Sequence, residues 1–355
     1  MEEHPRRGGI VGRGAAGNPK NRFERLSVEP EPPEEPGEEL RPETVYLRDR
    51  SRSIIARNGS PDIGFDASIN PYRGCEHGCA YCYARPTHEY LGLSAGLDFE
   101  TKVLVKEEAP ELLRRELSSP RWRPRPLSMS GVTDPYQPVE RRLRLTRRCL
   151  EVLAEFRNPV AVVTKNHLVT RDADLLAELA RHGAAAVAVS LTTLDDGLRR
   201  VMEPRTSRPA RRLAAIERLA EAGVPVGVMA APVIPGLNDH ELPRLLSAAA
   251  GAGAGFAACV PVRLPGAVAP LFEDWLSRHL PDRKEKVLNR IRSMRGGALN
   301  DPRFGSRMRG EGFYADHIAR LFEISCRRAG IEPGCFPRLS TAAFRRAEGQ
   351  QTLFG

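Results

Sequence analysis

Between about residue 66 and residue 262, the chain alternates short apolar runs with amphipathic stretches of helical periodicity. The apolar runs span residues 66–72, 127–131, 160–165, 185–191, 224–230 and 255–262. Several intervening stretches end in glycine, which is common just after a helix C-terminus. Regular alternation of this kind favours parallel strands joined by right-handed helical crossovers. The pattern therefore predicts an α/β fold of six β/α units, two short of a complete eight-fold barrel.

The flanking stretches predict the domain limits. We expect a core over residues 61–268 and a helical extension over residues 269–340. Helical periodicity in this extension covers residues 271–280, 282–294 and 312–330. Residues 1–50 include a run rich in proline and glutamate that cannot bury much apolar surface, so we expect a disordered or extended tail. Residues 341–355 are expected to be flexible.

Hydropathy and net charge indicate which compartments and partners suit this chain. No apolar run approaches the ~20 residues of a membrane span, and the first residues lack the apolar segment of a secretory signal. We therefore expect a cytoplasmic protein without a membrane partner. The net charge of +9 is compatible with a nucleic-acid partner, but arginines on solvated helix faces explain it equally well.

Three cysteines lie close together just after the first predicted strand. Cys75, Cys79 and Cys82 have CxxxCxxC spacing, which suits three irons of a 4Fe–4S cluster and leaves the fourth iron without a protein ligand. An electron-transfer ferredoxin normally closes all four positions with cysteine. The triplet therefore predicts a cluster with one iron open for chemistry.

Three other uses of the cysteine triplet fit the sequence less well. Zinc needs four ligands, and His77 is a fourth in principle, although its place inside the first loop is poor for closing a tetrahedron. A disulfide is disfavoured by the odd total of seven cysteines and the absence of a secretory signal. Chance clustering of buried cysteines is disfavoured because Gly74 and Gly78 indicate a loop.

Tyr81 stands before the third cysteine, and the CxxxCx-aromatic-C pattern resembles that of radical S-adenosylmethionine (SAM) enzymes. The resemblance implies a partial (β/α)6 barrel with SAM bound to the open iron of a 4Fe–4S cluster. It also implies reductive cleavage of SAM to a 5′-deoxyadenosyl radical, and a one-electron reductant of the flavodoxin or ferredoxin type. Tyr81 itself is expected beside the cofactor.

In such barrels the active residues follow the C-terminal ends of the strands. Polar or glycine-rich segments follow each predicted strand here, and they supply candidates for holding SAM. The candidates are Ser130, Gly131 and Thr133 after the second strand, Lys165 after the third, Ser190 and Arg205 after the fourth, and Ile234 and Gly236 after the fifth. Lys165 would neutralise the methionine carboxylate. Arg205 and Glu203 either form a carboxylate clamp or pair with each other, and Asp239 is expected to cap the next helix.

Five segments together resemble the branch of the superfamily that contains spore photoproduct lyase. They are residues 72–85, 131–140, 163–166, 202–213 and 231–239. Residues 12–24 further resemble an uncharacterised bacterial subgroup of that branch. The resemblance implies Thr133, Lys165 and Ser190 as SAM contacts, with a nucleic-acid base or DNA lesion as substrate.

One departure from that branch concerns the hydrogen donor. The lyase has a hydrogen-donating cysteine at the end of its second strand, where this chain has Gly131. Repair by the same radical relay is therefore not expected. Tyr83, Tyr136 and Cys259 are the alternative hydrogen donors in this sequence.

Two other function classes and one further partner stay open. An iron–sulfur electron carrier or redox sensor, or a nucleic-acid-binding protein with a structural cluster, would also use the cysteines. The polar strand ends favour the enzyme over a carrier, which needs no methionine pocket. Gln350, Leu353 and Phe354 resemble the short peptide by which bacterial repair proteins bind the replication sliding clamp. A three-position match of this kind also arises by chance.

Overall fold

The computed structural model describes residues 10–24, 40–334 and 337–346. Its main sheet has eight strands in the order β11-β10-β9-β8-β7-β6-β3-β2. The strands are β2 (Ile55–Arg57), β3 (Ala67–Ile69), β6 (Leu127–Met129), β7 (Val160–Thr164), β8 (Ala185–Ser190), β9 (Val226–Val233), β10 (Phe256–Pro261) and β11 (Glu332–Pro333). The six central strands run parallel, as the sequence predicted, and form the expected partial barrel. Antiparallel β2 and parallel β11 occupy the two edges.

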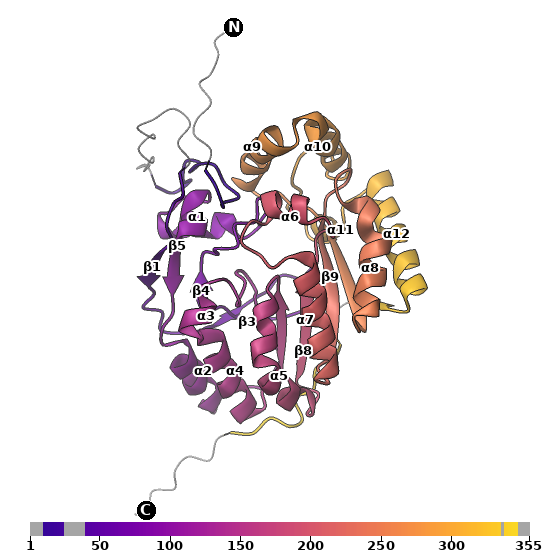
Figure 1. The fold of residues 1–355 in the computed structure, drawn as a ribbon. Coiled ribbons are helices and arrows are strands. Elements are labelled where there is room, and N and C mark those ends of the chain that lie inside the picture. The colour runs from indigo at the N-terminus through magenta and orange to yellow at the C-terminus, as the bar shows by residue number, and fades with distance from the viewer. Residues whose placement is uncertain (1–9, 25–39, 335–336, 347–355) are drawn as a thin grey trace, which may run out of the picture.

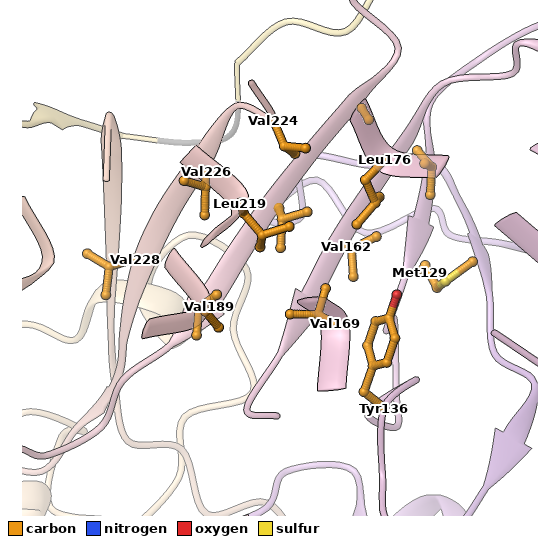
Figure 2. Packing of buried hydrophobic residues seen from close by; sticks show 14 of the residues in the cluster. Met129, Tyr136, Val162, Val169, Leu176, Val189, Leu219, Val224, Val226 and Val228 are labelled. Atoms are coloured by element: carbon orange, nitrogen blue, oxygen red, sulfur yellow. The ribbon is translucent and has the colours of Figure 1, made fainter. Parts of the chain in front are cut away.

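Helices on the outer face of this sheet follow the strands in turn (Figure 1). They are α2 (Ala109–Ser118), α4 (Leu145–Phe156), α5 (Ala173–Ala180), α7 (Pro209–Glu221) and α8 (Leu242–Gly251). The connections after β6, β7, β8 and β9 contain the short elements α3 (Glu140–Leu143), η2 (His167–Asp172), α6 (Asp196–Met202) and η3 (Asp239–Glu241). Their apolar stripes pack on the outward side chains of the strands. Figure 2 shows Val162, Val189 and Val228 from the sheet beside Leu176 and Leu219 from α5 and α7.

The inner face of the sheet carries small side chains. Ser68, Ser128, Ala161 and Ala186 are paired in register across four neighbouring strands. Along β7, buried outward residues alternate with partly exposed inward ones, and the inward residues are Ala161 and Val163. Short side chains therefore line this row of the inner face.

The C-terminal helices have two different positions. α12 (Phe313–Ala329) packs against α8 and β10 and so extends the outer helix layer. α9 (Val268–His279), η4 (Pro281–Arg283) and α10 (Lys284–Ser293) lie at one end of the barrel, next to α6, and pack against the cysteine loop (Figure 1). Short α11 (Ser306–Arg309) contacts β10.

Part of the expected N-terminal tail belongs to the folded core. β1 (Val45–Arg48) pairs with β5 (Lys102–Val105), which pairs with β4 (Tyr72–Arg73), and these three strands form a second small sheet. Residues 10–24 pack beside η1 (Arg85–Leu91) and α1 (Leu97–Thr101). The sequence did not predict this because β1 pairs with residues more than fifty positions away. Among the described residues, no helix is both long enough and apolar enough to span a bilayer.

Candidate functional site

The three cysteines lie on one loop that follows β4. Gly74 and Gly78 adopt positive φ values of +80° and +65°, which few other residues tolerate. At Gly78 a Cβ atom would lie 2.5 Å from a carboxylate oxygen of Glu100, so close approach requires glycine there as well. Cys75 and Cys79 are buried and Cys82 is partly buried, and all three are free thiols. The loop therefore presents its cysteines from a constrained backbone.

A buried ion pair holds this loop from behind. Arg85 and Glu100 are fully buried and lie 2.5 Å apart. The Arg85 guanidinium donates to the Cys79 carbonyl at 2.8 and 3.0 Å. The Glu100 carboxylate accepts from the backbone N–H groups of Gly14 and Ala15 at 3.0 and 2.9 Å. Through Glu100 and Arg85, residues 14–15 are thereby held against the cysteine loop.

The donor set fits an iron–sulfur cluster better than a single metal ion. Burial raises the pKa of the Cys82 thiol to about 11 and that of Cys79 well above its usual range, so both require a bound cation to ionise. No three His, Cys, Asp or Glu side chains in the described part of the chain are grouped to hold one metal ion. A cubane spaces its thiolates more widely than a single ion does, because each cysteine binds a different iron.

His77 does not complete a zinc site with these cysteines. Its Nδ1 lies 3.3 Å from the Asp134 carboxylate and its Nε2 lies 3.3 Å from the Asn166 amide. Burial alone would lower the pKa of His77, but Asp134 and then Cys75 raise it to about 10. The His77 ring therefore faces Asp134 and Asn166.

A second buried network lies beside the loop and includes Tyr81. The Lys165 Nζ atom lies 3.2 Å from the Glu203 carboxylate and donates to Thr192 Oγ1 at 3.1 Å. The Tyr81 hydroxyl also donates to Glu203, and Lys165 lies 5.6 Å from the centre of the Tyr81 ring. Burial would raise the pKa of Glu203, but Arg212 and then Lys165 hold it well below its usual range. The network therefore keeps a carboxylate and a lysine beside the cysteines.

The end of β6 supplies the next predicted residues. Ser130 has φ of +108°, which is a strained value for a residue with a side chain. A Cβ at Gly131 would lie 2.8 Å from Ser68 Oγ, so glycine lets this turn approach β3 closely. The Thr133 hydroxyl donates to the Tyr72 carbonyl at 2.9 Å and is 3% exposed. Asp134 accepts from the Lys165 backbone N–H at 2.7 Å, which joins the ends of β6 and β7.

The predicted residues after β8, Ser190 and Arg205, have separate partners. Arg205 does not pair with Glu203, because its guanidinium lies 3.4 Å from Glu76 and 3.4 Å from Thr44 Oγ1. Ser190 is buried, and its carbonyl accepts from Arg212 at 3.0 Å.

The turn after β9 lies next to the cysteine loop. Ile234 is fully buried in one apolar cluster with Cys79 and Tyr81. Gly236 has φ of +85°, and its N–H donates to Asp239 at 3.0 Å. Asp239 therefore stabilises this turn and is not the N-cap of α8, which begins after Glu241.

The three hydrogen-donor candidates differ in their surroundings. Tyr136 is fully buried in the apolar cluster of Figure 2. Cys259 packs into the same outer cluster, where burial and then Cys326 of α12 raise its pKa. Tyr83 is 53% exposed, yet burial raises its pKa to about 12. Its hydroxyl donates to the Gly131 carbonyl at 3.4 Å, at the turn after β6.

Several residues of the site carried no sequence signal. Thr192 and Arg212 complete the network around Glu203, and the Arg85–Glu100 pair supports the loop. Buried ion pairs between distant residues have no characteristic spacing, so only the structure identifies them.

The sequence model of the radical SAM superfamily matches residues 69–249, slightly more than half of the chain. The chain belongs to the radical SAM superfamily. Members of this superfamily use a 4Fe–4S cluster and SAM, so the family and cofactor predictions are confirmed.

The radical SAM chain has uncharacterised relatives. It is 41% identical over 222 residues to a protein of Mycobacterium tuberculosis, a match that covers 62% of this chain and 65% of the relative. It is 30% identical over 173 residues to a protein of Methanocaldococcus jannaschii, covering 49% and 62%. The chain thus spans less than two thirds of the length of these curated relatives.

Its fold is similar to that of spore photoproduct lyase complexed with dinucleoside spore photoproduct. The TM-score is 0.60 with 16% identity, and the match covers 83% of this chain and 82% of the lyase. A lyase variant with bound SAM and dinucleoside spore photoproduct gives a TM-score of 0.55 at 18% identity. The radical SAM barrel expected from the sequence is therefore confirmed.

Proposed function

We propose that this chain holds a 4Fe–4S cluster through Cys75, Cys79 and Cys82 and uses it to cleave SAM reductively for a reaction on a nucleic-acid base. The supporting observation is the position of the three thiols. They lie on a rigid loop that packs in one cluster with Ile234, beside the Lys165–Glu203 network. When bound, the cluster and SAM supply a 5′-deoxyadenosyl radical; the protein binds, orients and excludes water.

In this proposal the residues at the strand ends hold SAM. Lys165 places a positive charge beside the cysteine loop, and Glu203 fixes the position of its Nζ atom. Thr133 and Ser190 are proposed as further contacts, with Ser130 and Gly131 providing a turn that approaches closely. Ile234 and Gly236 are proposed to flank the adenine, and Tyr81 to pack beside the cofactor. Arg205 is proposed to act through Glu76, which it contacts.

A nucleic-acid base or lesion is the proposed substrate class. The net charge of +9 suits a polyanion, and the structurally similar lyase is described in complex with dinucleoside spore photoproduct. Gly131 stands where that branch has a donor cysteine, so the reaction is proposed to differ from spore photoproduct repair. Tyr83 is the proposed hydrogen donor, because Tyr136 and Cys259 lie in the outer apolar cluster.

The proposed partners follow from this chemistry. A one-electron reductant of the flavodoxin or ferredoxin type would supply the electron, and a cytoplasmic location is proposed because the cluster needs a reducing compartment. The clamp-binding hypothesis rests on Gln350, Leu353 and Phe354, which lie outside the described residues. Loss of clamp binding on truncation after Glu348, measured by calorimetry, would support it; equal binding by both chains would contradict it.

Anaerobic reconstitution with electron paramagnetic resonance tests the cofactor assignment. The reduced wild-type protein should hold about four irons, and its signal should change when SAM is added, because SAM binds an iron that the protein leaves open. Cys79→Ala should lose the cluster, while Cys326→Ala, which removes a buried cysteine from α12, should retain it. A closed cluster, as in an electron carrier, would give a signal that SAM leaves unchanged.

A further inference from the structure

A basic segment connects the end of β10 to the loop between β2 and β3. Residues 303–309, here called the rim segment, include α11 and read Arg-Phe-Gly-Ser-Arg-Met-Arg. The buried Arg295 guanidinium donates to the carbonyls of Val262, Ser306 and Arg307 at 2.9, 3.2 and 2.7 Å, which fastens the segment to the end of β10. Asp62, in the loop between β2 and β3, accepts from Gly305 N–H and Arg307 Nε at 2.7 and 2.6 Å. The rim segment is therefore a fixed bridge.

Positive charge on and beside this bridge exceeds negative charge. The arginines are Arg263, Arg295, Arg303, Arg307 and Arg309, and the carboxylates near them are Asp62, Asp301 and Glu311. Asp62 pairs with Arg307, while Asp301 and Glu311 pair with Arg303. No carboxylate in the described part of the chain forms an ion pair with Arg263 or Arg309. Arg263 and Arg309 are therefore available to a negatively charged ligand.

Arg263 is the least satisfied of these arginines. It directly follows Val262 at the end of β10, and its guanidinium donates to the Met308 sulfur at 3.0 Å, a weak acceptor. Its Nε is buried and finds no acceptor among the described residues. Burial and then Arg307 lower the pKa of Arg263, while Tyr83 and Asp62 act in the opposite direction. An arginine in these surroundings gains more from an incoming anion than a solvated one does.

Exposed aromatic rings accompany the unpaired charges. Phe304 is 61% exposed, and the Arg307 guanidinium carbon lies 4.5 Å from the centre of its ring. Tyr83 is 53% exposed and electrostatically coupled to Arg263. Basic side chains interleaved with exposed rings suit single-stranded nucleic acid, whose phosphates take the charges and whose bases stack on the rings. An acidic peptide would use the charges but not the rings.

We propose that Arg263 and the rim segment bind the phosphodiester backbone of a single-stranded nucleic acid, with Phe304 stacking against a base. The backbone would then pass beside Tyr83, which directly follows Cys82 at the cysteine loop. This placement extends the proposed function by naming how the substrate is held, while the binding itself does not depend on turnover.

Fluorescence anisotropy with a labelled single-stranded oligonucleotide tests the proposal on the full reconstituted chain. The variants are Arg263→Gln, Arg309→Gln and Phe304→Ala. Arg218→Gln on α7 is the matched control, because it removes one exposed arginine from the outer helix layer. Arg263→Gln should weaken binding about 5- to 10-fold and flatten the salt dependence by roughly one phosphate contact, and Arg218→Gln should change neither. Phe304→Ala should weaken binding with the salt dependence unchanged.

Two results would overturn the proposal. One is equal affinity of Arg263→Gln and Arg218→Gln for the oligonucleotide. The other is competition by polyglutamate as strong as that by an unlabelled oligonucleotide of equal charge, which would show that the surface selects charge alone. Arg263→Lys should recover part of the affinity and thereby separate a charge effect from misfolding. Because the assay needs no reductant and no SAM cleavage, its outcome is independent of the radical chemistry.

Discussion

The Lys165 Nζ atom lies 3.2 Å from the carboxylate of Glu203, although the two residues follow different strands and are separated by 38 positions. Glu203 is fully buried and also pairs with Arg212. The carboxylate therefore keeps one cationic partner when the other is engaged elsewhere. The proposed turn of Lys165 toward the SAM carboxylate would therefore not leave Glu203 as an uncompensated buried charge.

Replacement of Lys165 tests this role. Lys165→Ala should weaken SAM binding by roughly 1–3 kcal/mol, because the variant lacks a partner for a carboxylate in a partly buried site. Iron content should stay at the wild-type level, since Arg212 still neutralises Glu203. Calorimetric titration of SAM measures the change, and Lys286→Ala, on the exposed face of α10, is the control. Wild-type affinity in Lys165→Ala would refute the role.

Two glycines have similar backbone geometry but different surroundings, so substituting each one separates the effect of backbone strain from that of close packing. Gly78 and Gly92 have φ of +65° and +74°, but an added Cβ meets the Glu100 carboxylate only at Gly78. Gly92→Ala should lower the free energy of unfolding by about 1 kcal/mol, because only backbone strain opposes the added Cβ there. Gly78→Ala should cost more and also reduce iron uptake, because it displaces the cysteine loop from Glu100. Denaturant unfolding and iron analysis give both values; equal losses in the two variants would contradict the account.

His88 should make the stability of the fold depend on pH. Burial lowers its pKa to about 4, while its Nε2 lies 3.0 Å from the Lys102 carbonyl and therefore donates to it. The unfolded chain, with an ordinary histidine pKa near 6.5, binds more protons between about pH 6.5 and 4. His88 thus contributes its full stabilisation above pH 6.5. As the pH drops toward 4, the free energy of unfolding falls by up to about 3 kcal/mol from this group.

His88→Gln provides the comparison for that prediction. Glutamine can still donate to the Lys102 carbonyl but does not titrate. Urea unfolding at pH 7.5 and at pH 5 should therefore show a smaller loss of stability in the variant than in the wild type. An identical loss in both proteins would exclude His88 as a source of the pH dependence.

The sequence predicted the elements with local signatures. The apolar run 160–165 became β7. α4, whose buried face includes Leu145, Cys149, Val152 and Phe156, is one of the helices predicted between the apolar runs. The cysteine loop was recognised from the spacing of its cysteines together with Gly74, Gly78 and Tyr81. The partners of Glu203 and Glu100 were not predicted, because Arg212 and Gly14 contact these carboxylates only in the folded chain. β1 was also not predicted, because its strand partner β5 lies far along the chain.

Production of 5′-deoxyadenosine tests the central claim most directly. Wild-type and Cys79→Ala proteins would be reconstituted anaerobically, reduced and incubated with SAM, and the nucleoside would be measured by chromatography and mass spectrometry. The account predicts 5′-deoxyadenosine and methionine in equal amounts from the wild type, and none above background from Cys79→Ala. A wild-type protein that carries its cluster in full but yields no 5′-deoxyadenosine would contradict it.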